Sequence, residues 1–332
     1  MTDTAQTLLT VEDLSVRIGQ GATGIVAVDG VSFDVRQGEV LGIVGESGSG
    51  KSVTLRTILG LGDRNRKVSG AIHWQGSDLL GMSKRHVRAL RGREIGVVFQ
   101  DAMTALNPVA TVGAQIQDTL KRHTQMTASA RRERVLELLR LVGIADAEAR
   151  ANDYPHQFSG GMRQRVMIAI ALAAEPKLLL ADEPTTALDV TVQDQILRLL
   201  LRLRDELGMS VVLVTHDLGV VAETCDRVAV MYAGRIVECG PVDEIFRRPR
   251  HAYTLALLNS IPAGGRSARK LNSIAGMLPK GVNRAPGCIF APRCSHATAM
   301  CHSLSTPLVA IDDGHKTACL HHSVLPMPHA PS

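Results

Sequence analysis

The fold is decided by one stretch of the chain, residues 40–52, which reads VLGIVGESGSGKS. Its first part, Val40–Val44, is a continuous apolar run, which is typical of a β-strand buried on both faces. Its second part, Gly45-Glu46-Ser47-Gly48-Ser49-Gly50-Lys51-Ser52, fits the pattern G-x-x-x-x-G-K-[ST]. A helical pattern over Lys51–Leu59 follows. The stretch therefore predicts a strand, a glycine-rich turn and a helix, which is half of a βαβ unit.

This turn has the chemistry of a phosphate site. Glycines let the backbone curl so that successive N–H groups point at phosphate oxygens, and the positive end of the helix adds to the attraction. Lys51 is expected to reach the β- and γ-phosphates, and Ser52 to bind Mg²⁺. The alternative is an accidental glycine turn, and the position of the loop between a buried strand and a helix argues against it.

A second apolar run ends in two acids, in the sequence LLLADE at residues 178–183. The carboxyl ends of strands are where open α/β sheets bind ligands. Asp182 is expected to hold Mg²⁺, directly or through water, and Glu183 to accept a proton from the attacking water. The alternative is a pair of acids that caps the next helix.

A third motif reads QFSGGMRQR at residues 157–165. Ser159, Gly160 and Gly161 open a predicted helix over residues 161–174, so they form a second helix N-terminus suited to phosphate.

Together the three motifs resemble those of the ATP-binding-cassette ATPases, whose signature LSGGQ is here FSGGM at Phe158–Met162. The resemblance implies an α/β P-loop NTPase core with an antiparallel β subdomain and an α-helical subdomain at about residues 101–175. It also implies two ATP molecules held head to tail between two cassettes. By the same resemblance, Gln100 is expected to contact Mg²⁺ and the attacking water and to sense the transmembrane partner. Asp189 is expected to lie in a loop that crosses the interface between the two cassettes, and His216 to contact the γ-phosphate.

One feature of that family is missing. No aromatic residue lies between Thr10 and Ser32 to stack on adenine. Ile18, Ile25 or the partner chain remain as candidates for covering the base.

Further segments are similar to the oligopeptide, dipeptide and nickel importer branch, namely FQDAMTALNP at 99–108, RHAYT at 250–254 and GCIFAPRC at 287–294. This resemblance implies a cassette over residues 8–245, a small loop-rich C-terminal domain over 246–322 and a flexible tail over 323–332. The function it implies is hydrolysis of ATP to energise peptide import. A nickel or other small-solute importer is the alternative. A soluble, non-transport cassette protein is less favoured, since neither a long coiled-coil insertion nor a second cassette is present.

The same branch implies the partners. A second ATPase is required, a paralogue in preference to a second copy, with two membrane permeases and a periplasmic or extracellular solute-binding protein. The expected location is peripheral, at the cytoplasmic face of the inner membrane.

Four of the six cysteines are spaced C-x5-C-x6-C-x17-C, at Cys288, Cys294, Cys301 and Cys319. Thiolates are soft ligands that suit iron–sulfur clusters or zinc, but the close C-x2–4-C pair of structural zinc sites is absent. The importer branch implies a four-iron four-sulfur cluster; zinc, free thiols and adventitious disulfides remain alternatives. His296, His302 and His315 could substitute as ligands or be solvated, whereas the isolated Cys225 and Cys239 are interpreted as buried apolar residues.

The amino-acid composition excludes several other classes of protein. Hydrophobic residues make up 45% of the 332 residues and charged residues 21%, which excludes a disordered chain. Aromatic residues make up only 3%, which argues against a protein that binds single-stranded nucleic acid by stacking on its bases. The net charge of +5 does not require a nucleic-acid partner either, so none is predicted. The longest apolar runs, such as Val166–Ala174, reach about half of the roughly 18 residues that span a bilayer. The first ten residues lack the pattern of a signal peptide, which leads us to expect a cytosolic protein.

Overall fold

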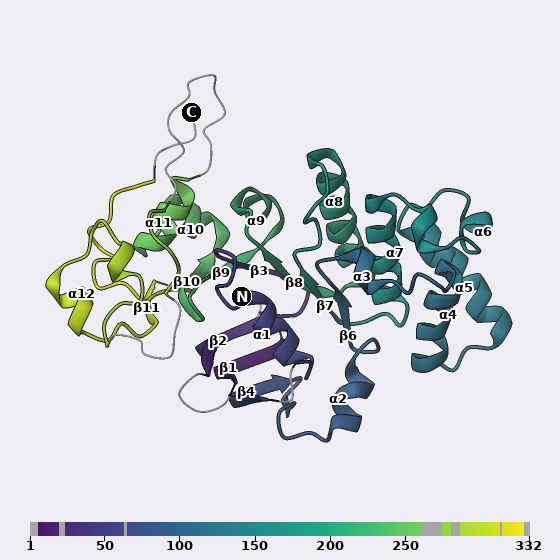
Figure 1. The fold of residues 1–332 in the computed structure, drawn as a ribbon, viewed down its shortest axis with the longest axis horizontal. Helices are drawn as coiled ribbons and strands as arrows, with labels where there is room; N and C mark the ends of the chain where they lie inside the picture. The colour runs from purple at the N-terminus through teal and green to yellow at the C-terminus, as the bar shows by residue number, and fades with distance from the viewer. Residues whose placement is uncertain are drawn as a thin grey trace. The chain divides into compact units, whose positions relative to one another are not determined.

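The computed structural model describes residues 6–19, 24–62, 65–260, 274–279, 286–312 and 314–328. Its contacts divide the chain into two compact units. The first is drawn from the chain up to Val35, from Val40–Leu80 and from Thr215 onward, and the second from Arg36–Glu39 and Gly81–Val214. Figure 1 labels most of the elements of both.

The first unit contains a four-stranded sheet with the order β2-β1-β4-β5. In β1 (Thr7–Ile18) and β4 (Arg66–Trp74), which are antiparallel, Leu9 lies opposite Trp74 and Ile18 opposite Arg66. The other members are β2 (Ile25–Arg36) and the two-residue β5 (Ser77–Asp78). This is the antiparallel β subdomain that the sequence predicts.

A second set of strands in the same unit carries the glycine-rich loop. All of β3 (Val40–Val44) is buried, and β3 pairs in parallel with β9 (Arg227–Tyr232), with Val44 opposite Val230. From β9 the sheet continues antiparallel through β10 (Arg235–Pro241), β12 (His315–Thr317) and β11 (Val309–Asp312). Strands β12 and β11, close to the C-terminal end of the described residues, therefore extend the sheet that contains β3.

Helical segments complete the described part of the first unit. Helix α1 (Lys51–Ile58) follows the loop, and α9 (Leu218–Thr224) packs against β3. The others are α10 (Val242–Arg247), α11 (Ala252–Leu258), the 3-10 turn η3 (Ala291–Arg293) and α12 (Ala299–Ser303).

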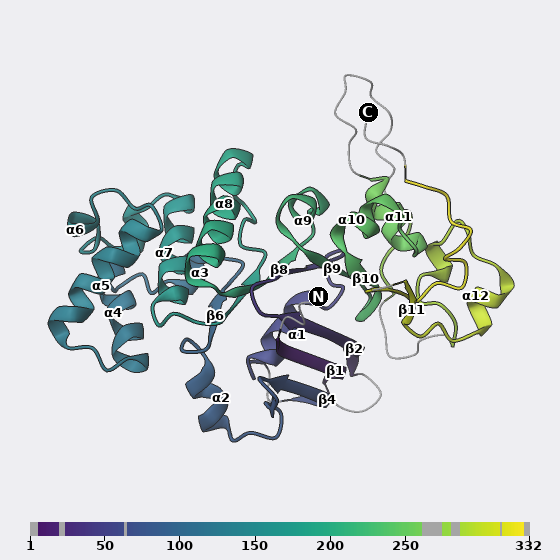
Figure 2. The same ribbon diagram turned by 180° about the vertical axis from the view of Figure 1, so that it is seen from behind.

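The second unit has three parallel strands, in the order β6-β7-β8, and a group of helices. Ala181 of β7 (Leu178–Asp182) lies opposite Val98 of β6 (Ile95–Val98), and Asp182 lies opposite Val214 of β8 (Ser210–Thr215). Both ribbon views show α4, α5 and α7 side by side (Figures 1 and 2), as their contacts require. The helices are α2 (Lys84–Leu90), α3 (Ala102–Ala105), α4 (Val112–His123), α5 (Ala128–Leu141), α6 (Ala147–Arg150), α7 (Gly160–Leu172) and α8 (Val190–Leu207), with a 3-10 turn at Pro155–Gln157.

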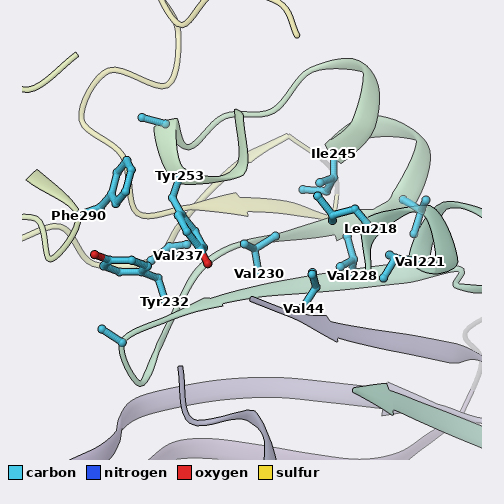
Figure 3. Close-up of a cluster of buried hydrophobic side chains, with 13 residues drawn as sticks. Val44, Leu218, Val221, Val228, Val230, Tyr232, Val237, Ile245, Tyr253 and Phe290 are labelled. Atoms are coloured by element: carbon cyan, nitrogen blue, oxygen red, sulfur yellow. The ribbon is translucent and has the colours of Figure 1, made fainter. Parts of the chain in front are cut away.

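Three aromatic rings tie the C-terminal part of the chain to β9. The ring of Tyr232, at the end of β9, lies 4.6 Å from that of Tyr253 on α11, and Phe290 lies 5.3 Å from both. Figure 3 shows the three rings together beside Val230 and Val237. All three side chains are buried, so residues far apart in the sequence share one core.

A buried carboxylate provides a second tie. Glu238 on β10 is fully buried, and it accepts hydrogen bonds from the backbone N–H groups of Arg250 (2.5 Å) and His251 (3.0 Å). His315 Nε2 lies 2.8 Å from the same carboxylate. His315 thus binds Glu238 rather than lining the cavity of the four cysteines, which does not favour the suggestion that it substitutes as a metal ligand.

The predicted domain boundary between residues 245 and 246 stays a prediction.

None of the helices in the described parts of the chain combines the length and apolar character needed to cross a lipid bilayer.

We predict that Phe290→Ala lowers the free energy of unfolding by about 3–5 kcal/mol, because it leaves a cavity beside Tyr232 and Tyr253. The matched control is Leu304→Ala, since Leu304 is 44% exposed and is expected to change stability by no more than about 0.5 kcal/mol. Urea unfolding of both variants measures the difference. Equal, small effects would show that the C-terminal segment does not share the core.

Candidate functional site

The loop at residues 45–52 is shaped by close backbone contacts. A Cβ at Gly45 would collide with the carbonyl oxygen of Met231, and one at Gly50 would lie 2.5 Å from the carbonyl oxygen of Ala27. Gly50 also has φ +106°, in the left-handed region that favours glycine. Only glycine fits at these two places, so the loop has the form that the sequence predicts.

The loop ends in a helix start that suits an anion. Gly50 caps α1 without a side-chain hydrogen bond, and the first turn of α1 carries no acid. Lys51 is buried, and its Nζ donates hydrogen bonds to the carbonyl oxygens of Gly45 (2.7 Å) and Glu46 (3.1 Å). The ammonium group therefore lies within the curl of the loop, at the positive end of the helix.

The acidic pair lies in the second unit, at the end of β7. Asp182 is buried and is the last residue of the strand. Glu183 has φ +48°, which is uncommon for a residue with a side chain and is found at functional sites. Its carboxylate accepts hydrogen bonds from Gln100 Nε2 (3.2 Å) and Thr186 Oγ1 (2.9 Å). The structure thus brings Gln100 and Glu183 together. It also shows Thr186 as a second donor to Glu183, which the sequence analysis did not identify.

Ser159 opens α7 as expected. Its Oγ accepts a hydrogen bond from the N–H of Met162 at 3.3 Å, and the helix begins at Gly160, one residue before the predicted start. Phe158, which replaces the leucine of the signature, is buried. A Cβ at Gly161 would lie 2.5 Å from Val192 Cγ1, whereas one at Gly160 would have ordinary contact with Leu188 at 3.5 Å. The second glycine is therefore required by the packing of α7 on α8.

The two remaining predicted residues stand at helix starts. Asp189 caps α8, and its Oδ1 accepts a hydrogen bond from the N–H of Val192 at 2.9 Å. His216 is exposed and follows β8, and the next residue, Asp217, caps α9. The first unit holds the loop and His216, and the second holds Gln100, Ser159, Asp182, Glu183 and Asp189. Of the two isoleucines suggested to cover the adenine base, Ile25 is 58% exposed and Ile18 is half-buried.

The four C-terminal cysteines line one small cavity in the first unit, together with His251, Phe290, His296 and His321. Burial raises the pKa of the Cys288 and Cys294 thiols, and it raises the pKa of Cys319 to about 11. Proximity of the other cysteines adds to each of these shifts. Among the described residues, no group of three or more His, Cys, Asp or Glu side chains has an arrangement that could hold a metal ion. Cys225 is not among the residues that line this cavity; it is half-buried, and desolvation raises its pKa to about 12, as expected for an unreactive thiol.

Comparison with known proteins agrees with this architecture. The profile of the ABC transporter family matches residues 28–186, and that of the oligopeptide/dipeptide transporter C-terminal region matches residues 237–301. The dipeptide transport ATP-binding protein DppD of Haemophilus influenzae is 52% identical over 302 residues, which is 91% of this chain and 92% of that protein. The chain belongs to the ABC transporter family, as an ATPase.

Two further proteins support the assignment to ABC ATPases. DppD of Escherichia coli K12 is 48% identical over 313 residues, 94% of this chain and 96% of that one. A solved dimer of the ATP-binding cassette MJ0796, bound to ADP and Pi after hydrolysis, has a TM-score of 0.64 at 32% identity. That match covers 71% of this chain and 99% of the solved chain, and it confirms the predicted cassette fold.

We predict that Gly161→Ala lowers the free energy of unfolding by about 1–3 kcal/mol, because the new methyl group meets Val192 and α7 must shift. Gly160→Ala is the matched control, and it is expected to be neutral or slightly stabilising, since alanine favours a helix. Thermal unfolding of the two variants tests the difference.

The double variant Gly161→Ala/Val192→Ala supplies the second control. It is expected to regain part of the loss that can be attributed to the collision. Identical behaviour of the two glycine variants would contradict the packing argument.

Proposed function

We propose that this ABC ATPase is the ATP-hydrolysing subunit of an importer for peptides, dipeptides in particular. The observation that carries this proposal is the similarity to two DppD proteins at about half identity over more than nine-tenths of the chain. The match of residues 237–301 to the oligopeptide/dipeptide transporter C-terminal region supports it, because that family is named for transporters of peptides.

The residues near each phosphate-binding element take the following roles in this proposal. Backbone N–H groups of the loop and the ammonium group of Lys51 bind the β- and γ-phosphates. Glu183 takes the proton from the attacking water, and Gln100, which donates to its carboxylate, orients both. His216 contacts the γ-phosphate. Mg²⁺, when bound, neutralises charge on the phosphates, and Ser52, Asp182 and Gln100 are the residues that would hold it.

Hydrolysis would need two cassettes. Ser159, Gly160 and Gly161 stand at the start of α7 and would bind the γ-phosphate of ATP on a partner cassette, with Asp189 at the crossing between the two. A paralogue is proposed as the partner in preference to a second copy. Two permeases and a solute-binding protein complete the complex, and the ATPase would sit peripherally at the cytoplasmic face of the membrane. We propose that residues 8–245 form the cassette, that 246–322 form the C-terminal domain and that 323–332 form a flexible tail. Residues 329–332 of that tail lie outside the described residues.

We predict that Glu183→Gln in the assembled complex lowers ATP hydrolysis by about 100-fold or more, because the proton acceptor is lost. Glu206→Gln, an exposed acid on α8 of the same unit, is the control and is expected to stay within about twofold. Uptake of a labelled dipeptide and of nickel ions is measured in the same membranes. Undiminished hydrolysis would remove Glu183 from its role, and uptake of nickel without peptide would overturn the proposed substrate.

We further propose a four-iron four-sulfur cluster on Cys288, Cys294, Cys301 and Cys319. A single zinc ion needs its four ligands at about 2.3 Å from one point, and the described side chains offer no such group. A cluster lies between its thiolates, since each binds a different iron, and the four cysteines surround a common cavity.

An unpartnered nitrogen on the same cavity supports a cluster. His251 is buried, and desolvation lowers its pKa to about 3, so its ring is neutral. Its Nδ1 accepts a hydrogen bond from the N–H of Tyr253 at 3.0 Å, which leaves the ring proton on Nε2. Within the described parts of the chain Nε2 has no hydrogen-bond partner. The sulfur atoms of a bound cluster would accept this hydrogen bond.

We predict that protein purified without oxygen absorbs broadly near about 400 nm and carries about four iron and four sulfide ions per chain. Cys294→Ser is expected to lose most of this absorbance, whereas the control Cys239→Ser, on β10, keeps it. Absorbance spectra and metal analysis of the three proteins decide the matter. A colourless, zinc-loaded protein would overturn the proposal.

A further inference from the structure

Glu46, the second residue of the phosphate loop, is held by the C-terminal part of the chain. Its carboxylate makes two parallel hydrogen bonds with Arg293, from Nη1 to Oε2 (2.7 Å) and from Nη2 to Oε1 (2.9 Å). Its backbone N–H donates to the hydroxyl of Tyr253 at 2.9 Å. One loop residue is thus fixed at both its side chain and its backbone by residues more than 200 positions away.

Arg293 is itself fully engaged. A guanidinium has five N–H groups, and all five of Arg293 have acceptors in the structure. The three acceptors besides the carboxylate oxygens are the hydroxyl of Tyr232 (3.3 Å) and the carbonyl oxygens of Ile274 (3.1 Å) and Ala275 (2.9 Å). The side chain is only 7% exposed, and the guanidinium carbon lies 5.7 Å from the ring centroid of Tyr232. Arg293 therefore has one fixed position.

The negative charge of Glu46 is the reason why the contact with Arg293 matters for phosphate binding. The carboxylate belongs to a loop that is shaped to receive phosphates, and like charges at short range repel strongly where solvent is partly excluded. The bidentate pair offsets that charge and holds it in one direction. The carbonyl oxygen of Glu46 also accepts hydrogen bonds from Lys51 Nζ (3.1 Å) and from the N–H of Ser49 (3.1 Å). A shift of Glu46 would therefore move the groups that bind phosphate.

We propose that Arg293 is a positioning residue of the ATP site, which keeps the Glu46 carboxylate neutralised and turned away so that the loop can accept the phosphates of ATP. The C-terminal region thereby becomes part of the nucleotide site, although none of its residues is proposed to touch the nucleotide. This inference rests on the proposed placing of the phosphates at residues 45–52.

The test measures the Kd of the full chain for the magnesium complex of a non-hydrolysable ATP analogue. Arg293→Met is expected to weaken binding about tenfold or more, because the unpaired carboxylate faces the phosphates. Glu46→Gln/Arg293→Met is expected to return to within about threefold of the parent, since the repelling charge is gone. A role in packing alone would leave the double variant as weak as Arg293→Met, and that result would overturn the proposal.

Arg227→Met is the matched control. Arg227 forms a bidentate pair with Asp34 in the same unit, at 3.0 and 3.1 Å, and its side chain is 17% exposed. Its loss is expected to lower stability but to leave the Kd unchanged. If Arg293→Met does not fold, Arg293→Lys replaces it, because lysine keeps the charge but loses the bidentate geometry, and a loss of about twofold to fivefold is expected. An unchanged Kd in the folded variant overturns the proposal.

Lys51→Ala separates this inference from the proposed site. Loss of binding in Lys51→Ala together with an unchanged Kd in the Arg293 variants refutes only the role of Arg293. Normal binding in Lys51→Ala would instead refute the placing of the phosphates on this loop, and with it the basis of the inference.

Discussion

The phosphate loop keeps its shape because neighbouring backbone occupies the space where side chains would otherwise stand. The parallel pairing of β3 with β9 sets this arrangement, since Val44 opposite Val230 brings Met231 beside Gly45. Gly234, in the turn after β9, then donates its N–H to the carbonyl oxygen of Ser49 at 2.7 Å. The anion site is therefore a product of strand register, and the loop sequence works only next to this strand and turn.

The acidic pair is positioned by a different means. Asp182 is fixed because β7 is paired with β8 up to its last residue and with β6 up to Ala181, the residue before it. Glu183 takes a left-handed backbone conformation, and this conformation is maintained by a hydrogen bond from its N–H to Val214 O and by the two donors on its carboxylate. Strain of this kind persists only where surrounding contacts determine the position of the residue. The one carboxylate is buried and the other is held by Gln100 and Thr186, which is consistent with two separate roles.

The sequence was sufficient wherever the signal is local. The strands at 40–44 and 178–182 and the helix after the loop were predicted to within a residue, because apolar runs bounded by turns need no distant partner. β10, β11 and β12 were missed. β11 and β12 are only four and three residues long, and all three strands are defined by distant pairings such as Cys239 with Lys316. His251 and His321 were likewise not connected with the cysteines, and Glu46 and Arg293 were interpreted only as parts of two separate motifs. No pattern of spacing reveals a contact between residues so far apart.

That distant contact changes how the C-terminal region is understood. A complete cassette can be built without such a region, as the coverage of the solved cassette indicates. In this chain, however, the rings of Tyr232 and Tyr253 pack in the aromatic core, while their hydroxyl groups accept hydrogen bonds from Arg293 and from the N–H of Glu46. Packing in the core therefore fixes the donors that hold the loop. In the proposed role, the cation at residue 293 offsets the charge of Glu46 beside the phosphates, so the acid at residue 46 and the arginine at residue 293 are expected to depend on each other.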